Sequence, residues 1–155
     1  MSQHRPSRHP LSRCQRGASL LEVLIAVLVL AIGMLGVAAM QAMSLRNSLS
    51  ALERSQATVQ SYAILDAMRA NVVEARNNTY NLALAAAPCP APAAGGTLAS
   101  RDLNNWINSL QTTLGPSACG AVACAANVCE VTIRWNDERG TGGVAAQQLL
   151  TRSRI

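Results

Sequence analysis

The N-terminal part of the chain contains an apolar run that extends over residues 18–43. A single carboxylate, Glu22, interrupts it near its start. A helix needs about 20 mostly apolar residues to span a bilayer, and this run is long enough. An ionisable side chain within such a segment is costly and is a functional-site hypothesis by default. The pattern therefore predicts a membrane helix over residues 18–43 with a functional carboxylate at Glu22.

The helical pattern continues beyond this run. Proline and glycine are absent between residues 37 and 87, and three asparagines between residues 77 and 81 mark a helix end near Tyr80. Apolar residues recur at steps of three, four and seven, with charged and amide residues between them. This stripe consists of Leu45, Leu49, Leu52, Val59, Tyr62, Leu65, Met68 and Val72. We expect one helix from residue 18 to about 80, whose amphipathic half, within residues 44–82, packs on a small head.

The remainder of the chain predicts a linker, a second helix and a sheet. Residues 83–99 are rich in alanine, proline and glycine, and Ser100 is a candidate N-cap for the helix that follows. That helix has an apolar stripe and stops at Gly115. Three strands are expected at residues 121–124, 129–135 and 144–155. The predicted class for residues 18–155 is α+β, with a long N-terminal helix packed on a small antiparallel sheet and one additional helix, the last two within residues 100–155.

The net charge of +5 arises mainly from the first 17 residues. Residues 1–17 contain arginines and no acidic residue, whereas arginines and carboxylates nearly balance in the rest of the chain. A basic tail before an apolar helix places the N-terminus in the cytoplasm and the C-terminal part across the membrane. A nucleic-acid-binding surface would need a basic cluster on the folded part, so we expect no nucleic-acid partner. We interpret residues 1–17 as a leader outside the fold.

Four cysteines follow the apolar run, whereas Cys14 precedes it. In an oxidising compartment an even number of cysteines predicts up to two disulfides, and three pairings are possible. The four residues are Cys89, Cys119, Cys124 and Cys129. Their spacing lacks the C-x2-C pairs of structural zinc sites, and both histidines lie in the leader. We therefore predict disulfides and no metal site.

Candidate catalytic chemistry is missing from the sequence. Beyond residue 17 the chain has no histidine and no lysine, which are common general bases, and it has no glycine-rich phosphate loop. We predict neither an enzymatic activity nor a cofactor. Trp106 and Trp135 lie on apolar stripes and are expected to pack in the core, with an exposed adhesive role as the alternative.

Residues 17–23 read GASLLEV and resemble the processing site of type IV prepilins. In that family a short basic leader ends in glycine, and glutamate is the fifth residue of the mature chain. The resemblance implies cleavage between Gly17 and Ala18 by a prepilin peptidase, methylation of the new Ala18 amine, and subunit assembly through Glu22. Here alanine replaces the usual phenylalanine or methionine at the first mature position. The alternatives are a glutamate that snorkels to the membrane interface and a secretory signal peptide.

Within this family the chain is similar to minor pilins of the PilV type, the type IV pilus modification proteins. The similarity lies in the anchor segment at residues 31–41, the DLNNW motif that begins at Asp102, and the CEVTIRWND strand at residues 129–137. It implies a structural subunit of the priming or tip complex that promotes pilus assembly and the presentation of an adhesin. The alternative is a minor pseudopilin of the type II secretion system, of the I type. A pilin that captures DNA is a third hypothesis, which the near-neutral mature chain disfavours.

The resemblance also implies partners and a location. The partners would be other minor pilins, the major pilin, the prepilin peptidase, the inner-membrane assembly platform and a tip adhesin. The chain would cross the inner membrane once, with a cytoplasmic N-terminus and a periplasmic head, before it enters the pilus at the cell surface.

Overall fold

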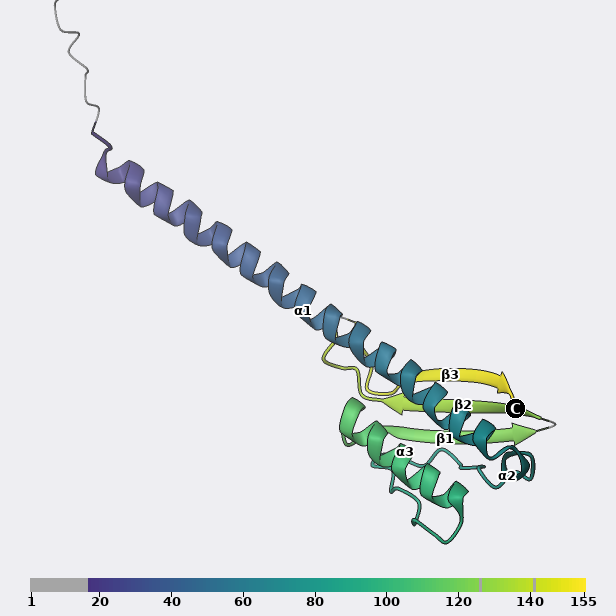
Figure 1. Cartoon of the computed structure of the whole chain (residues 1–155). Helices are drawn as coiled ribbons and strands as arrows, with labels where there is room; N and C mark the ends of the chain where they lie inside the picture. Colours follow the sequence, from purple (N-terminus) through teal and green to yellow (C-terminus); the bar gives the residue numbers. More distant parts are fainter. Residues whose placement is uncertain (1–16, 126, 141) are drawn as a thin grey trace, which may run out of the picture. The chain divides into compact units, whose positions relative to one another are not determined.

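A computed structural model describes residues 17–125, 127–140 and 142–155 (Figure 1). The elements are α1 (Leu20–Ala70), α2 (Val72–Arg76), α3 (Leu98–Leu114), β1 (Cys119–Ala125), β2 (Val128–Trp135) and β3 (Gln147–Arg154). The described residues fall into two units, one up to Met40 and one over Gln41–Ile155, and we call the second unit the head. Helix α1 contributes to both units.

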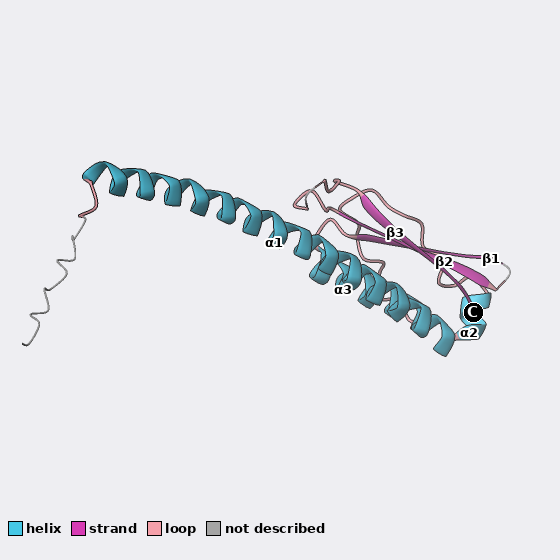
Figure 2. Ribbon diagram, turned by 90° about the horizontal axis from the view of Figure 1, so that it is seen from above, coloured by secondary structure: helices cyan, strands magenta, loops and turns pink. Residues whose placement is uncertain are grey.

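The head consists of two layers. Its sheet has the antiparallel order β1-β2-β3, with Val131 of β2 opposite Val122 on one side and Thr151 on the other. The part of α1 within the head and α3 both lie against one face of this sheet (Figure 2). The predicted α+β class, with a long N-terminal helix, a small antiparallel sheet and an additional helix, is confirmed.

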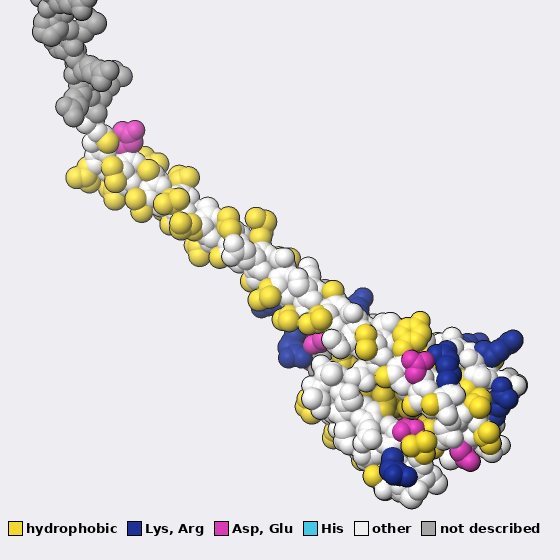
Figure 3. Space-filling model, viewed as in Figure 1, with side chains coloured by type: hydrophobic (Ala, Val, Ile, Leu, Met, Phe, Trp, Pro, Cys, Tyr) yellow, Lys and Arg dark blue, Asp and Glu magenta, His cyan; other side chains and the backbone are white. Residues whose placement is uncertain are grey.

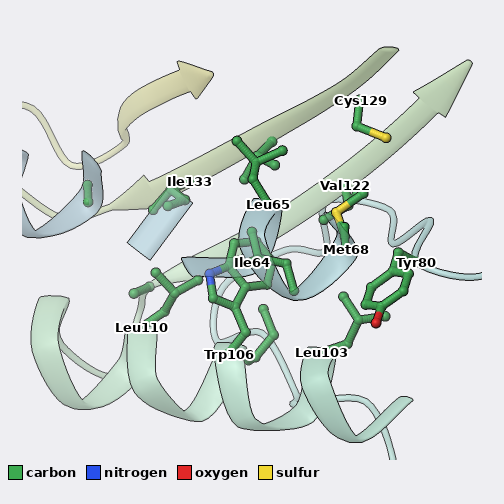
Figure 4. Close-up of a cluster of buried hydrophobic side chains, with 14 of the residues drawn as sticks. Ile64, Leu65, Met68, Tyr80, Leu103, Trp106, Leu110, Val122, Cys129 and Ile133 are labelled. Atoms are coloured by element: carbon green, nitrogen blue, oxygen red, sulfur yellow. The ribbon is translucent and has the colours of Figure 1, made fainter. Parts of the chain in front are cut away.

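Apolar side chains from both layers meet in one core (Figure 4). Its members include Ile64, Leu65, Met68, Leu103, Trp106, Leu110, Val122, Val131 and Ile133. The side chains of β2 alternate between buried and half-buried, which is the pattern expected of a strand with one covered face. Gly120 allows α3 to approach the sheet, because a Cβ there would collide with the Trp106 ring and lie 2.9 Å from Leu110 Cδ1. The prediction that Trp106 and Trp135 pack in the core is confirmed, since they are 4% and 1% exposed.

The predicted apolar stripe of α1 is only partly correct. Leu65 and Met68 are buried, but the members from Leu45 to Tyr62 are exposed. The face that packs on the head instead consists of Ala57, Ser61, Ile64, Leu65 and Met68. Small residues occupy its first turns because the helix lies close to the sheet, where Thr151 Oγ1 donates a hydrogen bond to Ser61 Oγ over 3.0 Å. Two different faces of α1 are therefore apolar, and the head covers one of them.

Helix α1 ends at Ala70, so the predicted end near Tyr80 is wrong. Asn71 leaves the helical region, with φ −125° and ψ 51°, and its N–H is shared between the carbonyl groups of Ala67 and Met68. The short helix α2 follows, and Asn78 adopts a left-handed φ of 61°, a conformation that asparagine tolerates better than most residues. The chain turns back here and carries Tyr80 into the core rather than into a longer helix.

Tyr80 links the end of α1 to α3. Its ring is fully buried, and its hydroxyl donates a hydrogen bond to Asp102 Oδ2 over 2.6 Å and accepts one from Asn71 Nδ2 over 3.3 Å. Burial, followed by the hydrogen bond to Asp102, raises the pKa of Tyr80 from its ordinary 10 to about 12. This hydrogen bond holds the first turns of α3 against the chain reversal.

Helix α3 begins earlier than predicted. Its N-cap is Thr97, whose hydroxyl accepts a hydrogen bond from the Ser100 N–H over 3.2 Å, so Ser100 lies in the first turn rather than at the cap. Threonine competes well for this position because its hydroxyl satisfies one of the first free N–H groups. The predicted stop is confirmed, since α3 ends at Leu114 and Gly115 has a φ of 99°, which favours glycine.

Two disulfides join the four predicted cysteines in the structure. Cys89 is bonded to Cys119, which fastens the linker to the start of β1, and Cys124 is bonded to Cys129 across the β1–β2 hairpin. The first bond closes a sequence separation of 30 and the second a separation of 5. Because the entropy removed from the unfolded chain grows with loop length, the Cys89–Cys119 bond contributes more to stability.

Tyr80→Phe should change how stability depends on pH. Because the proton of Tyr80 is bound more tightly in the folded state, its contribution is fully present below pH 10 and is lost as the pH rises from 10 to 12. The variant should be less stable at pH 7 by about 1 kcal/mol, the net value of a typical hydrogen bond. It should also lose less stability between pH 10 and 12. Urea unfolding followed by tryptophan fluorescence measures both quantities.

Tyr62→Phe is the matched control, because it removes the hydroxyl of a tyrosine on α1 that is 52% exposed. Equal pH profiles for Tyr80→Phe and the unmodified chain would contradict the assignment.

Candidate functional site

The candidate processing site lies just before α1. Gly17, Ala18 and Ser19 are exposed and outside any helix or strand, and α1 begins at Leu20 rather than at the predicted residue 18. A Cβ at Gly17 would meet no atom within 4 Å. The peptide bond between Gly17 and Ala18 is therefore accessible and non-helical, as a protease requires of its substrate. Residues 1–16 of the predicted leader, which include Cys14 and both histidines, lie outside the described residues.

Ser19 determines where the helix starts. Its hydroxyl accepts a hydrogen bond from the Glu22 N–H over 3.2 Å, and its carbonyl accepts one from the Val23 N–H over 3.2 Å. These are the bonds of an N-cap residue, and serine is among the best residues for this position. The sequence reasoning missed Ser19, although serine followed by glutamate three residues later is the signature of a capping box.

The Glu22 carboxylate is exposed in the first turn of α1. The positive end of the helix dipole favours a carboxylate there, by about 0.3–1 kcal/mol. The ion pairs among the described residues are Arg54–Asp137, Arg69–Asp66 and Arg139–Glu53, and none includes Glu22. Because Ser19 already caps the helix, the carboxylate is available to a cation from another molecule.

The first part of α1 exposes a continuous apolar surface (Figure 3). An 18-residue stretch of this helix has a mean hydropathy of 2.8, and none of it is buried. Leu20, Leu28 and Leu35 are 80%, 60% and 72% exposed. Soluble monomers rarely leave so large an apolar surface in water. By length and composition this helix can cross a membrane, where lipid would cover its apolar surface. The alternative is that another protein chain covers this surface.

The two glycines of this segment leave its surface open. A Cβ at Gly33 or Gly36 would meet nothing within 4 Å. Glycine at such positions lets a second helix approach closely in a membrane. The geometry is compatible with a helix contact here, and ordinary membrane-helix composition explains the glycines equally well.

Asp137 and Trp106 make polar contacts that join elements of the head. The Asp137 carboxylate is 1% exposed and accepts a hydrogen bond from Ser50 Oγ over 2.8 Å, with an Arg54 guanidinium nitrogen at 3.6 Å. Trp106 Nε1 donates to the Gln60 carbonyl over 3.0 Å. These contacts tie the β2–β3 loop and α3 to α1. Among the described residues no group of three or more histidine, cysteine, aspartate or glutamate side chains could hold a metal ion.

Comparison with known families gives one match. The family model described as the prokaryotic N-terminal methylation motif matches residues 12–38. It covers the last residues of the basic leader, the Gly17–Ala18 bond, Glu22 and the start of the apolar helix. Searches of curated proteins and of solved structures find no match. The motif and the fold together support a type IV pilin-like or pseudopilin-like subunit, which is a structural class of protein.

Ser19→Ala should weaken the start of α1. Loss of an N-cap side chain typically costs about 1 kcal/mol. The amides of residues 21–23 should therefore exchange hydrogen faster in the detergent-solubilised chain. Ser19→Asp, which restores a capping oxygen, should return exchange to its original rate, and exchange that is unchanged in Ser19→Ala would contradict the capping role.

Proposed function

We propose that this chain is a minor pilin of the type IV pilus, cut between Gly17 and Ala18 and assembled through Glu22. The observation that carries the proposal is the capped helix start. It leaves the predicted cleavage bond outside α1. One turn further on lies the Glu22 carboxylate, which forms no ion pair with any described residue. These features precede a long apolar helix, which is the arrangement that an assembly helix needs.

The chemistry of Glu22 supports assembly between subunits. A carboxylate that enters a low-dielectric environment without a partner is strongly disfavoured, but a nearby cation offsets much of that cost. Cleavage after Gly17 would create such a cation, the amine of Ala18, on every subunit. Pairing between Glu22 of one subunit and the Ala18 amine of its neighbour would set their axial stagger. Methylation of that amine would keep its positive charge.

The four cysteines and the tryptophan helix of the head favour a pilus subunit, of the PilV type, over a pseudopilin. Its α3 helix contains the tryptophan motif and its β2 strand ends at Trp135, as the resemblance implies. The chain would be held in the inner membrane by residues 18–43, with the head in the periplasm. There it would join the priming or tip complex with other minor pilins and the major pilin, and help to present an adhesin.

A minor pseudopilin of the type II secretion system is the second candidate. The N-terminal motif and the apolar helix serve both systems equally, so only the head discriminates between them. Deletion of the gene should abolish twitching motility and leave protein secretion intact. Loss of secretion with normal motility would favour the pseudopilin and contradict the pilus assignment.

The N-terminal chemistry has a direct test. We expect the mature chain to begin at Ala18 with a methylated amine, which intact-mass measurement detects. Glu22→Ala should still be cleaved, because the scissile bond is unchanged, but its incorporation into sheared filaments should fall strongly. Glu138→Gln is the control, since it removes a carboxylate from the exposed surface of the head.

A mature start at Met1 or near Gln41 would contradict the proposed processing. Normal incorporation of Glu22→Ala would contradict the role of the carboxylate.

A further inference from the structure

The exposed apolar face of α1 within the head repeats with the period of a coiled coil. Leu45, Leu52 and Val59 are seven residues apart, and Leu49, Gln56 and Ala63 alternate with them at steps of four and three. This 3.5-residue spacing is the a/d pattern of a helix that pairs with another helix. We call these six residues the seam.

The seam lies on a different side of α1 from the core. Leu45, Leu49, Leu52 and Val59 are 63%, 48%, 54% and 59% exposed. The buried face of α1, by contrast, begins at Ala57 and contains Ile64 and Leu65. At about 100° per residue, the two faces are separated by more than a quarter turn. Five of the six residues of the seam are exposed, and Gln56 is half-buried.

One border of the seam is hollowed. A cavity of about 340 Å³ is lined by Leu49, Leu52, Glu53 and Gln56 of α1 and by Thr113 of α3. An apolar side chain from a second helix can enter such a hollow, as a knob enters a hole in a coiled coil. Ala63, at the other end of the seam, leaves room for close approach.

Gln56 favours pairing with an identical helix in parallel. It is the polar member of the seam at an a position, and a single polar residue there fixes register at some cost in stability. In a parallel pair of identical helices, the two Gln56 amides face each other and can donate and accept hydrogen bonds mutually. Opposite an apolar residue of a different helix, the Gln56 amide would lose the hydrogen bonds that it makes to water in the unpaired chain.

The residues that flank the seam would not repel each other in such a pair. In a parallel, in-register arrangement, Ser48 of one helix faces Glu53 of the other, and Ser55 faces Gln60. No like charges meet at these positions. The Glu53 charge is also compensated within its own chain by Arg139 at 3.2 Å.

We propose that the seam binds the seam of a second copy of this chain, as a parallel two-helix coiled coil over residues 45–63. The parallel direction rests on the proposed function, because two chains anchored in one membrane emerge from it in the same direction. The pair forms before filament entry and brings two heads together without using the core face of α1.

Cysteine cross-linking in membranes tests the pairing. The full chain carries Cys14→Ser, to remove the leader thiol, and Val59→Cys as a reporter on the seam. Mild oxidation should give a disulfide-linked dimer of twice the monomer mass. The matched reporter Ala51→Cys is also exposed, but it lies off the seam. We expect about tenfold more dimer from Val59→Cys, because pairing raises the effective concentration of the two thiols.

A second pair of variants separates pairing from folding. Leu52→Arg, added to Val59→Cys, should abolish the dimer, because it places two arginines across the seam. Ala51→Arg, added to the same reporter, should leave the dimer unchanged. Equal dimer from both reporters, or a dimer that survives Leu52→Arg, overturns the proposal. A cross-link only to a protein of different mass also overturns it, since the occupant would then be another subunit.

The N-terminal mass is measured on the same samples. A chain that starts at Ala18 but forms no dimer overturns the pairing and leaves the proposed function intact. A dimer of chains that still start at Met1 overturns the proposed function and leaves the pairing intact.

Discussion

The head depends on the contact that one face of α1 makes with α3 and with the sheet. Ile64, Leu65 and Met68 supply the apolar surface of this face, and the Gln60 carbonyl accepts the Trp106 indole N–H from α3. Helix α3 in turn reaches the sheet only because Gly120 has no side chain. Without this face of α1, neither α3 nor the three strands could bury enough apolar surface to be stable, because a small sheet with one covered face needs a partner layer.

The same helix therefore serves two environments in succession along its length. Up to Met40 its surface is apolar on all sides and nothing in the described chain covers it. Beyond Ala57 one face is buried by the head, while Val59 and Tyr62 remain exposed on another face. A chain built in this way is incomplete as a monomer in water, because exposed apolar surface of this extent requires lipid or other subunits. Ser19 and Glu22 add a defined, charged start to the apolar part.

Predictions from the sequence succeeded where the cause was local. Helix and strand types followed from periodicity, and the end of α3 followed from Gly115. They failed where two local choices were close in energy. Thr97 and Ser100 are both good caps; the helix begins after Thr97, and Ala99, which lies between them, is buried. The α1 stripe was a mixture of two faces, and periodicity alone cannot say which face a tertiary contact covers.

The sequence by itself determined the apolar N-terminal helix, the position of Glu22 relative to the Gly17–Ala18 bond, and the α+β class, because these depend on composition and on short-range spacing. Only the tertiary structure decided that α1 ends at Ala70, that Cys89 pairs with Cys119, and that the leucines of the seam remain exposed. Each of these depends on which distant residues meet: Tyr80 returns to the core, the linker lies beside β1, and the sheet selects one face of α1. Long-range contacts of this kind leave no periodic trace in the sequence.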